Sequence, residues 1–120
     1  MKTYGLTLCL QNDPAKIESY KTHHQAVWPG VCARLREVGV QEMKIFLRDR
    51  RMFMFIETSD EFEPRRDFVR INEDPISQKW NTLMGTLQER APEASPDEWW
   101  APMELVFSLN WPQHQAKVAG

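Results

Sequence analysis

Tyrosine, histidine and tryptophan follow one another at four-residue intervals in the segment SYKTHHQAVWPG, residues 19–30. On a helix, side chains four positions apart are neighbours, so Tyr20 and His24 share one face. Histidine titrates near neutral pH and can give or take a proton. A tyrosine hydroxyl can hydrogen-bond to a ring oxygen, and the Trp28 ring could stack on a sugar. The pattern is compatible with proton transfer on a small polar ligand, and it is also typical of a hydrogen-bonded histidine among packed rings.

The remaining polar groups suggest neither a metal site nor a cofactor site. His23 points about 100° away from His24 on a helix, so we expect it to face solvent or a neighbouring strand. His23, His24 and His114 contain no pair spaced as helical metal ligands. The chain has no glycine-rich phosphate loop, which excludes the common nucleotide cofactors. We therefore expect a site that works without metal or cofactor.

Length and composition indicate one globular domain. The chain has 120 residues, of which 42% are hydrophobic and 27% charged, and its net charge is −2. It contains no basic block that would favour nucleic acid. No apolar run approaches the ~20 residues that span a bilayer, and the first residues do not resemble a secretion signal. Cys9 and Cys32 match no disulfide framework, so we expect reduced thiols, a cytoplasmic location and no membrane contact.

The elements that must position the first motif begin with a strand and a long amphipathic helix. Alternating apolar residues predict a strand over 4–10. Asn12-Asp13-Pro14 is a helix start, with a capping side chain before proline. An apolar stripe continues to Val38, and Pro29 interrupts it, so we expect a kink or restart near Trp28.

The second half of the chain predicts a hairpin, a second helix and a last strand. Residues 42–47 and 52–58 are strand-like and separated by a short charged turn. Residues 60–72 are expected to be partly helical, and a clear helix starts at Asp74-Pro75. A proline-rich loop over 90–102 leads to a strand at 103–109. The order β-α-β-β-α-β predicts an α+β, ferredoxin-like fold with both helices on one sheet face. The single domain is expected over 1–110, with a frayed tail at 111–120.

The sheet face opposite the helices is expected to be apolar. Phe46, Phe53, Phe55 and Phe107 are too hydrophobic for a solvated surface. Two such sheets packed together would cover them, so we expect a homodimer.

Four segments in this order resemble the L-rhamnose mutarotase family and its L-fucose-related relatives, over residues 3–109. The segments are ESYKTHHQAVWPGV, IFLRDRRMFMFIET, DPISQKWNTLM and ELVFSL. The resemblance implies a dimeric α+β barrel that interconverts the α and β anomers of a deoxy sugar without cofactor. It also implies that His24 is the proton donor and that Tyr20 and Trp80 contact the monosaccharide.

The chain departs from the rhamnose-type pattern at two sugar-contacting positions. Met43 stands where such members carry a tyrosine, and Asn81 replaces the second tryptophan of a pair that begins with Trp80. An amide offers donors and acceptors where a ring would stack, and L-fucose differs from L-rhamnose in hydroxyl stereochemistry. We expect the reaction to be retained and the preferred sugar to be set by these positions.

Other functions are open to this fold, because small dimeric α+β barrels also include oxygenases and non-catalytic binders of small molecules. A haem-dependent oxygenase would be coloured, and a binder would not accelerate anomer exchange. Within the mutarotase interpretation, Trp28 either stacks on sugar or packs beneath the site. The loop 92–102, with Trp99 and Trp100, is either a lid or plain packing.

Overall fold

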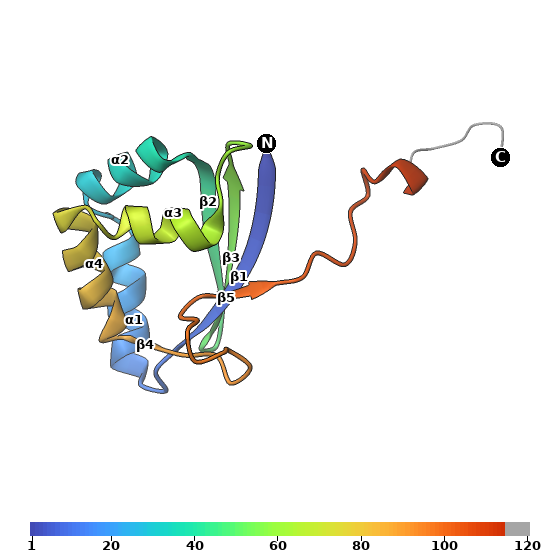
Figure 1. The fold of residues 1–120 in the computed structure, drawn as a ribbon. Helices are drawn as coiled ribbons and strands as arrows, with labels where there is room; N and C mark the ends of the chain where they lie inside the picture. Colours follow the sequence, from blue (N-terminus) through green and yellow to red (C-terminus); the bar gives the residue numbers. More distant parts are fainter. Residues whose placement is uncertain (115–120) are drawn as a thin grey trace.

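An antiparallel sheet covered on one face by helices forms the body of the molecule (Figure 1). The computed structural model describes residues 1–114. These residues form five strands, four helices and a short 3-10 turn. The elements are β1 (Lys2–Leu10), α1 (Pro14–His24), α2 (Pro29–Val38), β2 (Val40–Arg48), β3 (Arg51–Thr58), α3 (Pro64–Ile71), α4 (Pro75–Gly85), β4 (Gln88–Glu89), β5 (Ala101–Met103) and the turn Pro112–His114. The strand order is β2-β3-β1-β4, with β5 also pairing with β1. The predicted α+β class with helices on one sheet face is confirmed.

Side-chain caps followed by proline define where the helices begin. Asp13 accepts a hydrogen bond from the backbone N–H of Ala15, and Asp74 accepts one from Ser77. Proline fixes the backbone at the first helical position of α1, α2, α3 and α4, where no N–H is needed. Pro29 therefore starts a new helix, so the predicted interruption is a complete restart. Gly39 ends α2 in the left-handed conformation, with φ of 114°.

The central hairpin separates its side chains onto two faces. Phe46 pairs with Phe53 across β2 and β3. Along β3, Met52, Met54 and Ile56 are buried under the helices. The alternate residue Phe53 is 38% exposed and Phe46 58% exposed, and their rings stack at a centroid distance of 6.1 Å. The outer sheet face is therefore apolar and uncovered, as the sequence predicted for both residues.

Two groups of side chains fill the space between helices and sheet. The first joins β1 and β3 to α1 and α4 and contains Leu8, Leu10, Tyr20, Val31, Met52, Trp80, Met84 and Leu87. The second joins the sheet to α2 and α3 and contains Leu6, Val38, Val40, Met54, Ile56, Phe62 and Ile71. Tyr20 and Trp80 belong to the core and also border a cavity. Core packing therefore holds these two cavity side chains in place.

The predicted strand over 103–109 is wrong. The last strand is β5, at Ala101–Met103, and the chain then leaves the sheet as an irregular arm, residues 104–111 (Figure 1). The alternating pattern predicts burial, but nothing among residues 1–114 covers these side chains. Phe107 is consequently exposed on the arm and does not lie on the sheet face. Of the predicted tail, 112–114 form the 3-10 turn and 115–120 lie outside the described residues.

None of the helices among residues 1–114 has the length and apolar character needed to cross a bilayer.

Candidate active site

The rings of the Tyr20–His24 motif stack directly on one another. Their centroids are 4.0 Å apart and the planes differ by 24°. Trp80 of α4 approaches His24 edge-on at 5.3 Å. Trp28 in turn packs its edge against Trp80 at 5.1 Å. The helical spacing and the neighbouring helix together fix the His24 ring between two aromatic side chains.

One nitrogen of the His24 ring hydrogen-bonds to the backbone. Its Nδ1 lies 2.9 Å from the carbonyl oxygen of Tyr20, which can only accept a hydrogen bond. The Nδ1 must therefore carry the proton, and in the neutral ring Nε2 has the free lone pair. Burial lowers the pKa of His24, the bond to the Tyr20 carbonyl opposes this, and the charge of His23 lowers the pKa further. His24 is therefore a neutral base at physiological pH.

The Tyr20 hydroxyl is held in its protonated form. Burial raises the pKa of Tyr20 to about 12, and the hydrogen bond with the Gln88 side chain partly opposes the shift. Only 4% of the residue is exposed. Tyr20 can therefore donate a hydrogen bond next to a base, which is the arrangement that bifunctional proton transfer requires.

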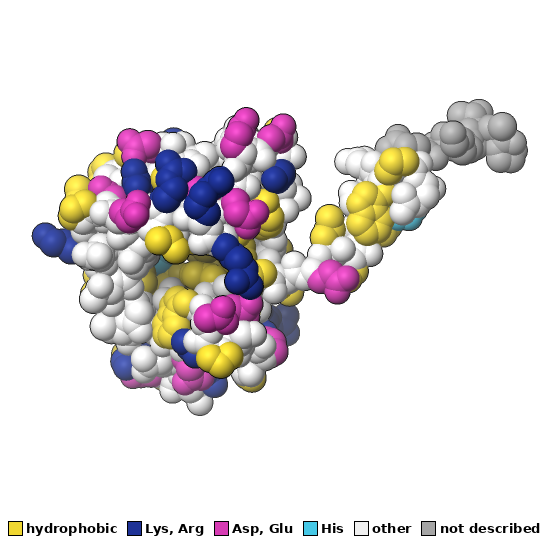
Figure 2. All heavy atoms as spheres, viewed as in Figure 1, with side chains coloured by type: hydrophobic (Ala, Val, Ile, Leu, Met, Phe, Trp, Pro, Cys, Tyr) yellow, Lys and Arg dark blue, Asp and Glu magenta, His cyan; other side chains and the backbone are white. Residues whose placement is uncertain are grey.

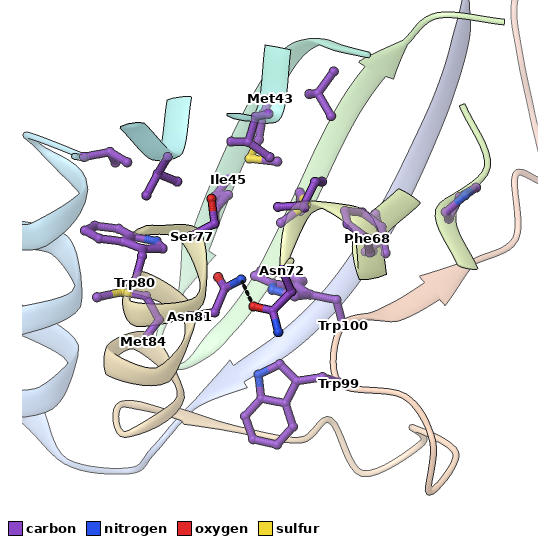
Figure 3. A pocket seen from close by; sticks show the side chains of 18 of the residues that line it. Met43, Ile45, Phe68, Asn72, Ser77, Trp80, Asn81, Met84, Trp99 and Trp100 are labelled. Atoms are coloured by element: carbon purple, nitrogen blue, oxygen red, sulfur yellow. Dashed lines mark hydrogen bonds between the residues drawn. The ribbon is translucent and has the colours of Figure 1, made fainter. Parts of the chain in front are cut away.

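A cavity of about 940 Å³ lies between the helices and the inner face of the sheet. It opens on the molecular surface as a hollow lined by hydrophobic side chains, near charged residues (Figure 2). All five residues predicted for the site line it: Tyr20, His24, Met43, Trp80 and Asn81. Figure 3 shows Met43 on the strand side and Trp80 and Asn81 on α4. The cavity volume lies at the upper end of the range typical of small-molecule sites.

Known proteins match the chain over nearly its full length. The sequence pattern of the L-rhamnose mutarotase family matches residues 3–109. The chain belongs to the L-rhamnose mutarotase family. It is 32% identical to an L-fucose mutarotase of Xanthomonas campestris, over 92% of this chain and 90% of that one. It is 39% identical to a UPF0734 protein of Dictyostelium discoideum, over 95% and 94%.

Solved structures agree on the fold. An L-rhamnose mutarotase from Formosa agariphila superposes with a TM-score of 0.68 at 24% identity, covering 90% of this chain and 98% of that chain. The tetracenomycin F2 cyclase of Streptomyces glaucescens superposes with a TM-score of 0.65 at 18% identity, covering 93% and 100%. Both likenesses show the fold alone, because both identities are below 25%. Family membership supports the interconversion of sugar anomers, which is the reaction of a carbohydrate isomerase. It fits this function better than that of a non-catalytic binder or an oxygenase.

The two positions that depart from the rhamnose-type pattern lie on different walls of the cavity. Met43 lies on β2, half-buried among the side chains that face the helices. Asn81 lies on α4, and its Nδ2 donates to Oδ1 of Asn72 at 3.0 Å (Figure 3). The result is a pair of amides on one wall and a thioether on the other.

Two of the rings near the motif lie outside the cavity wall. Trp28 does not appear among the lining residues and packs behind Trp80. His23 also does not line the cavity; its Nδ1 lies 2.7 Å from the carbonyl oxygen of Ser19, and its ring approaches Trp80 edge-on at 6.2 Å. Within the part of the chain that the structure describes, no three His, Cys, Asp or Glu residues gather as a metal site.

Sequence reasoning missed Gln88 and left Trp99 undecided. Gln88 is only 7% exposed and lines the cavity beside Tyr20. Its Oε1 accepts a hydrogen bond from Nε1 of Trp99 at 2.7 Å. No local pattern identifies a single glutamine after a helix, because its partners come from α1 and from a loop eleven residues later.

Proposed function

We propose that the protein interconverts the α and β anomers of a 6-deoxy-L-hexose, either L-fucose or L-rhamnose, by acid–base opening and closing of the ring without a cofactor. The observation that carries this proposal is a neutral His24 whose remaining nitrogen is available at a cavity large enough for a monosaccharide, beside a protonated Tyr20. Mutarotation requires only proton transfer, so this pair supplies the chemistry that the reaction needs.

His24 exchanges its proton with the ring oxygen. When the open aldehyde closes, Nε2 takes the proton of the attacking hydroxyl as that oxygen bonds to the anomeric carbon. When the ring opens, the imidazolium returns the proton to the same oxygen. As the ring closes, Tyr20 gives its hydroxyl proton to the aldehyde oxygen, so His24 gains one proton while Tyr20 loses one. As the ring opens, the Tyr20 oxygen takes the proton of the anomeric hydroxyl back. Rotation of the aldehyde between the two steps exchanges the anomers. Trp80 lies edge-on to His24 and offers an apolar surface to the sugar.

Met43 and Asn81 set the choice of sugar. The relatives include proteins named for L-fucose and for L-rhamnose, so the family accommodates both. The Asn72–Asn81 amide pair presents donors and acceptors to the cavity. Both residues are exposed without ligand, and a bound sugar would remove the amides from water. A sugar whose hydroxyls do not match them would then leave hydrogen-bonding groups unpaired, which is costly.

The working unit is a homodimer formed through the outer sheet face. Phe46 and Phe53 leave this face apolar, and the arm carries Leu105, Val106, Phe107 and Leu109, all strongly exposed. Figure 2 shows the arm extending from the body with hydrophobic side chains along it. A second copy would cover both surfaces with matching apolar groups.

The partners and location follow from composition. We expect a monosaccharide as the ligand, no nucleic acid and no membrane, since the net charge is −2. Cys9 and Cys32 are free thiols, which suits the reducing cytoplasm.

NMR exchange spectroscopy of anomeric protons tests the activity. Catalytic amounts of the protein should accelerate exchange in L-fucose or L-rhamnose more than in other aldoses. If the folded protein accelerates no sugar, the mutarotase function is wrong for this chain. Binding without acceleration would then favour a sugar-binding protein.

A further inference from the structure

Two consecutive tryptophans in the loop before β5 have different environments. Trp100 is half-buried and packs against both groups of core side chains, which explains it as an anchor of the loop. Trp99 remains 41% exposed although it lines the cavity. Figure 3 shows Trp99 on the loop side of the cavity, below the Asn72–Asn81 pair in this view. Core packing therefore accounts for Trp100 and leaves Trp99 without a packing role of this kind.

Two contacts fix the orientation of the Trp99 ring. Its Nε1 donates to Oε1 of Gln88 at 2.7 Å. The guanidinium of Arg90 lies over the ring, 5.9 Å from its centroid, within the range of a cation–π contact. With a cation over one face, the ring has its other face available as a wall of the cavity. A half-exposed indole held in this way is suited to contact with the apolar face of a sugar.

The Gln88 side chain connects this ring to the catalytic pair. An indole N–H can only donate, so the carbonyl oxygen of the Gln88 amide must face Trp99. Gln88 and Tyr20 both line the cavity, and the Gln88 side chain lowers the pKa of the Tyr20 hydroxyl through a hydrogen bond, for which the amide nitrogen is the group left over. An amide that donates to the Tyr20 oxygen leaves the hydroxyl proton of Tyr20 free for the ligand. The Gln88 backbone is itself fixed, because it pairs with Leu10 of β1.

We propose that Trp99 is a second sugar-contacting ring of the cavity and that Gln88 is a positioning residue that joins it to Tyr20. When the sugar contacts Trp99, the Trp99–Gln88 hydrogen bond fixes Gln88, and Gln88 in turn fixes the Tyr20 hydroxyl that donates to the anomeric oxygen. This deepens the proposed function and rests on it. The loop around Trp99 becomes a wall of the site, one whose position affects the proton donor.

Three single variants separate the two roles. Trp99→Ala removes the ring and should raise the dissociation constant and KM for the sugar by about threefold to tenfold. Trp99→Phe keeps a ring and removes the N–H, so it should mainly lower kcat. Gln88→Met keeps the approximate shape and removes both hydrogen bonds, so kcat should fall by about threefold to tenfold with the dissociation constant unchanged. The double variant Trp99→Phe/Gln88→Met should have a kcat no lower than that of Gln88→Met alone, because both substitutions break the same Trp99–Gln88 hydrogen bond.

Glu93→Gln is the matched control. It lies in the same loop and breaks an ion pair with Arg51, but it does not line the cavity. Its kinetics should equal those of the unmodified protein. Melting temperatures of all variants show whether the fold is retained.

Titration of the sugar, measured separately from turnover, keeps this inference distinct from the proposed function. If the unmodified protein neither binds nor turns over a deoxy sugar, both fail. If it does, and Trp99→Ala leaves affinity and KM unchanged in a folded protein, Trp99 does not contact the sugar. If Gln88→Met lowers kcat and affinity only in proportion to a loss of folded protein, Gln88 has a structural role and the positioning role is wrong.

Discussion

The two faces of the sheet differ in their cover: helices pack on the inner face, and the outer face is exposed. On the inner face, Met52, Met54 and Ile56 lie under helices from their own chain, and the cavity opens beside them. On the outer face, Phe46 and Phe53 have no cover from any element among residues 1–114. The strands alternate in the same way toward both sides. Because apolar residues occur on both sides, the sequence predicts that both faces are covered. It does not predict whether the same chain or a second copy covers each face.

The inner face carries the proposed catalytic residues, and the outer face carries the proposed dimer interface. The catalytic pair belongs to the inner face, where Tyr20 and His24 lie on one helix and their geometry depends on local packing. The outer face presents the exposed rings of Phe46 and Phe53, which match the apolar arm in character. Changes on the inner face should thus alter turnover, and changes on the outer face should alter association.

The largest effect is expected from His24→Ala, which removes the proton-transfer group from the inner face. General acid–base catalysis typically contributes ~10²–10⁴-fold, and kcat should fall by about this factor in anomeric exchange measured by NMR. The control is Lys21→Ala, an exposed position of the same helix that does not line the cavity. It should retain activity within about threefold. A folded His24→Ala protein with full activity would show that another group transfers the proton.

The next largest effect is expected on the outer face. Phe53→Arg places a charge in the proposed interface, and the dissociation constant of the dimer should rise about thirtyfold or more. Removal of the chain after Met103 should act in the same direction. Ala33→Arg adds the same charge to an exposed position of α2 and serves as control. Light scattering with size-exclusion chromatography measures the assembly; a monomer for the unmodified protein would contradict the interface altogether.

The sequence predicts the inner face well because its signals are local. Asp13-Pro14 and Asp74-Pro75 mark two helix starts, and the four-residue spacing brings Tyr20 onto His24. The same reasoning gives the cavity residue Trp80, because the helix stripe that buries it also points it toward α1.

What the sequence predicted wrongly, left open or missed depends on long-range contacts. The strand at 103–109 was inferred from alternation, yet a strand needs a neighbour, and the described part of the chain supplies one only as far as Met103. Trp28 has the residue type for stacking on sugar but packs behind Trp80. Gln88 has no local signal, since its importance comes from Tyr20 and Trp99 at distant positions.

A smaller effect is expected on selectivity, within the inner face itself. Asn81→Trp restores the ring of the rhamnose-type pattern and removes the amide bonded to Asn72. The ratio of kcat/KM for L-rhamnose to that for L-fucose should rise by about tenfold. Asn81→Ala removes the amide without adding a ring and shows which of the two changes matters. If neither variant changes the ratio, the sugar is selected elsewhere in the cavity.

The smallest effect is a shift in the pH profile, and it tests the state of His24. Burial lowers its pKa, so the neutral base persists below the ordinary histidine value of about 6.5. The rate should therefore stay level as the pH falls through 6.5 and decline only at lower pH, where His24 gains a proton. His24→Ala should lack this decline in the protein-dependent rate. A rate that instead rises as the pH falls would mean that the imidazolium is the active form, and that the inner face acts first as an acid at the ring oxygen.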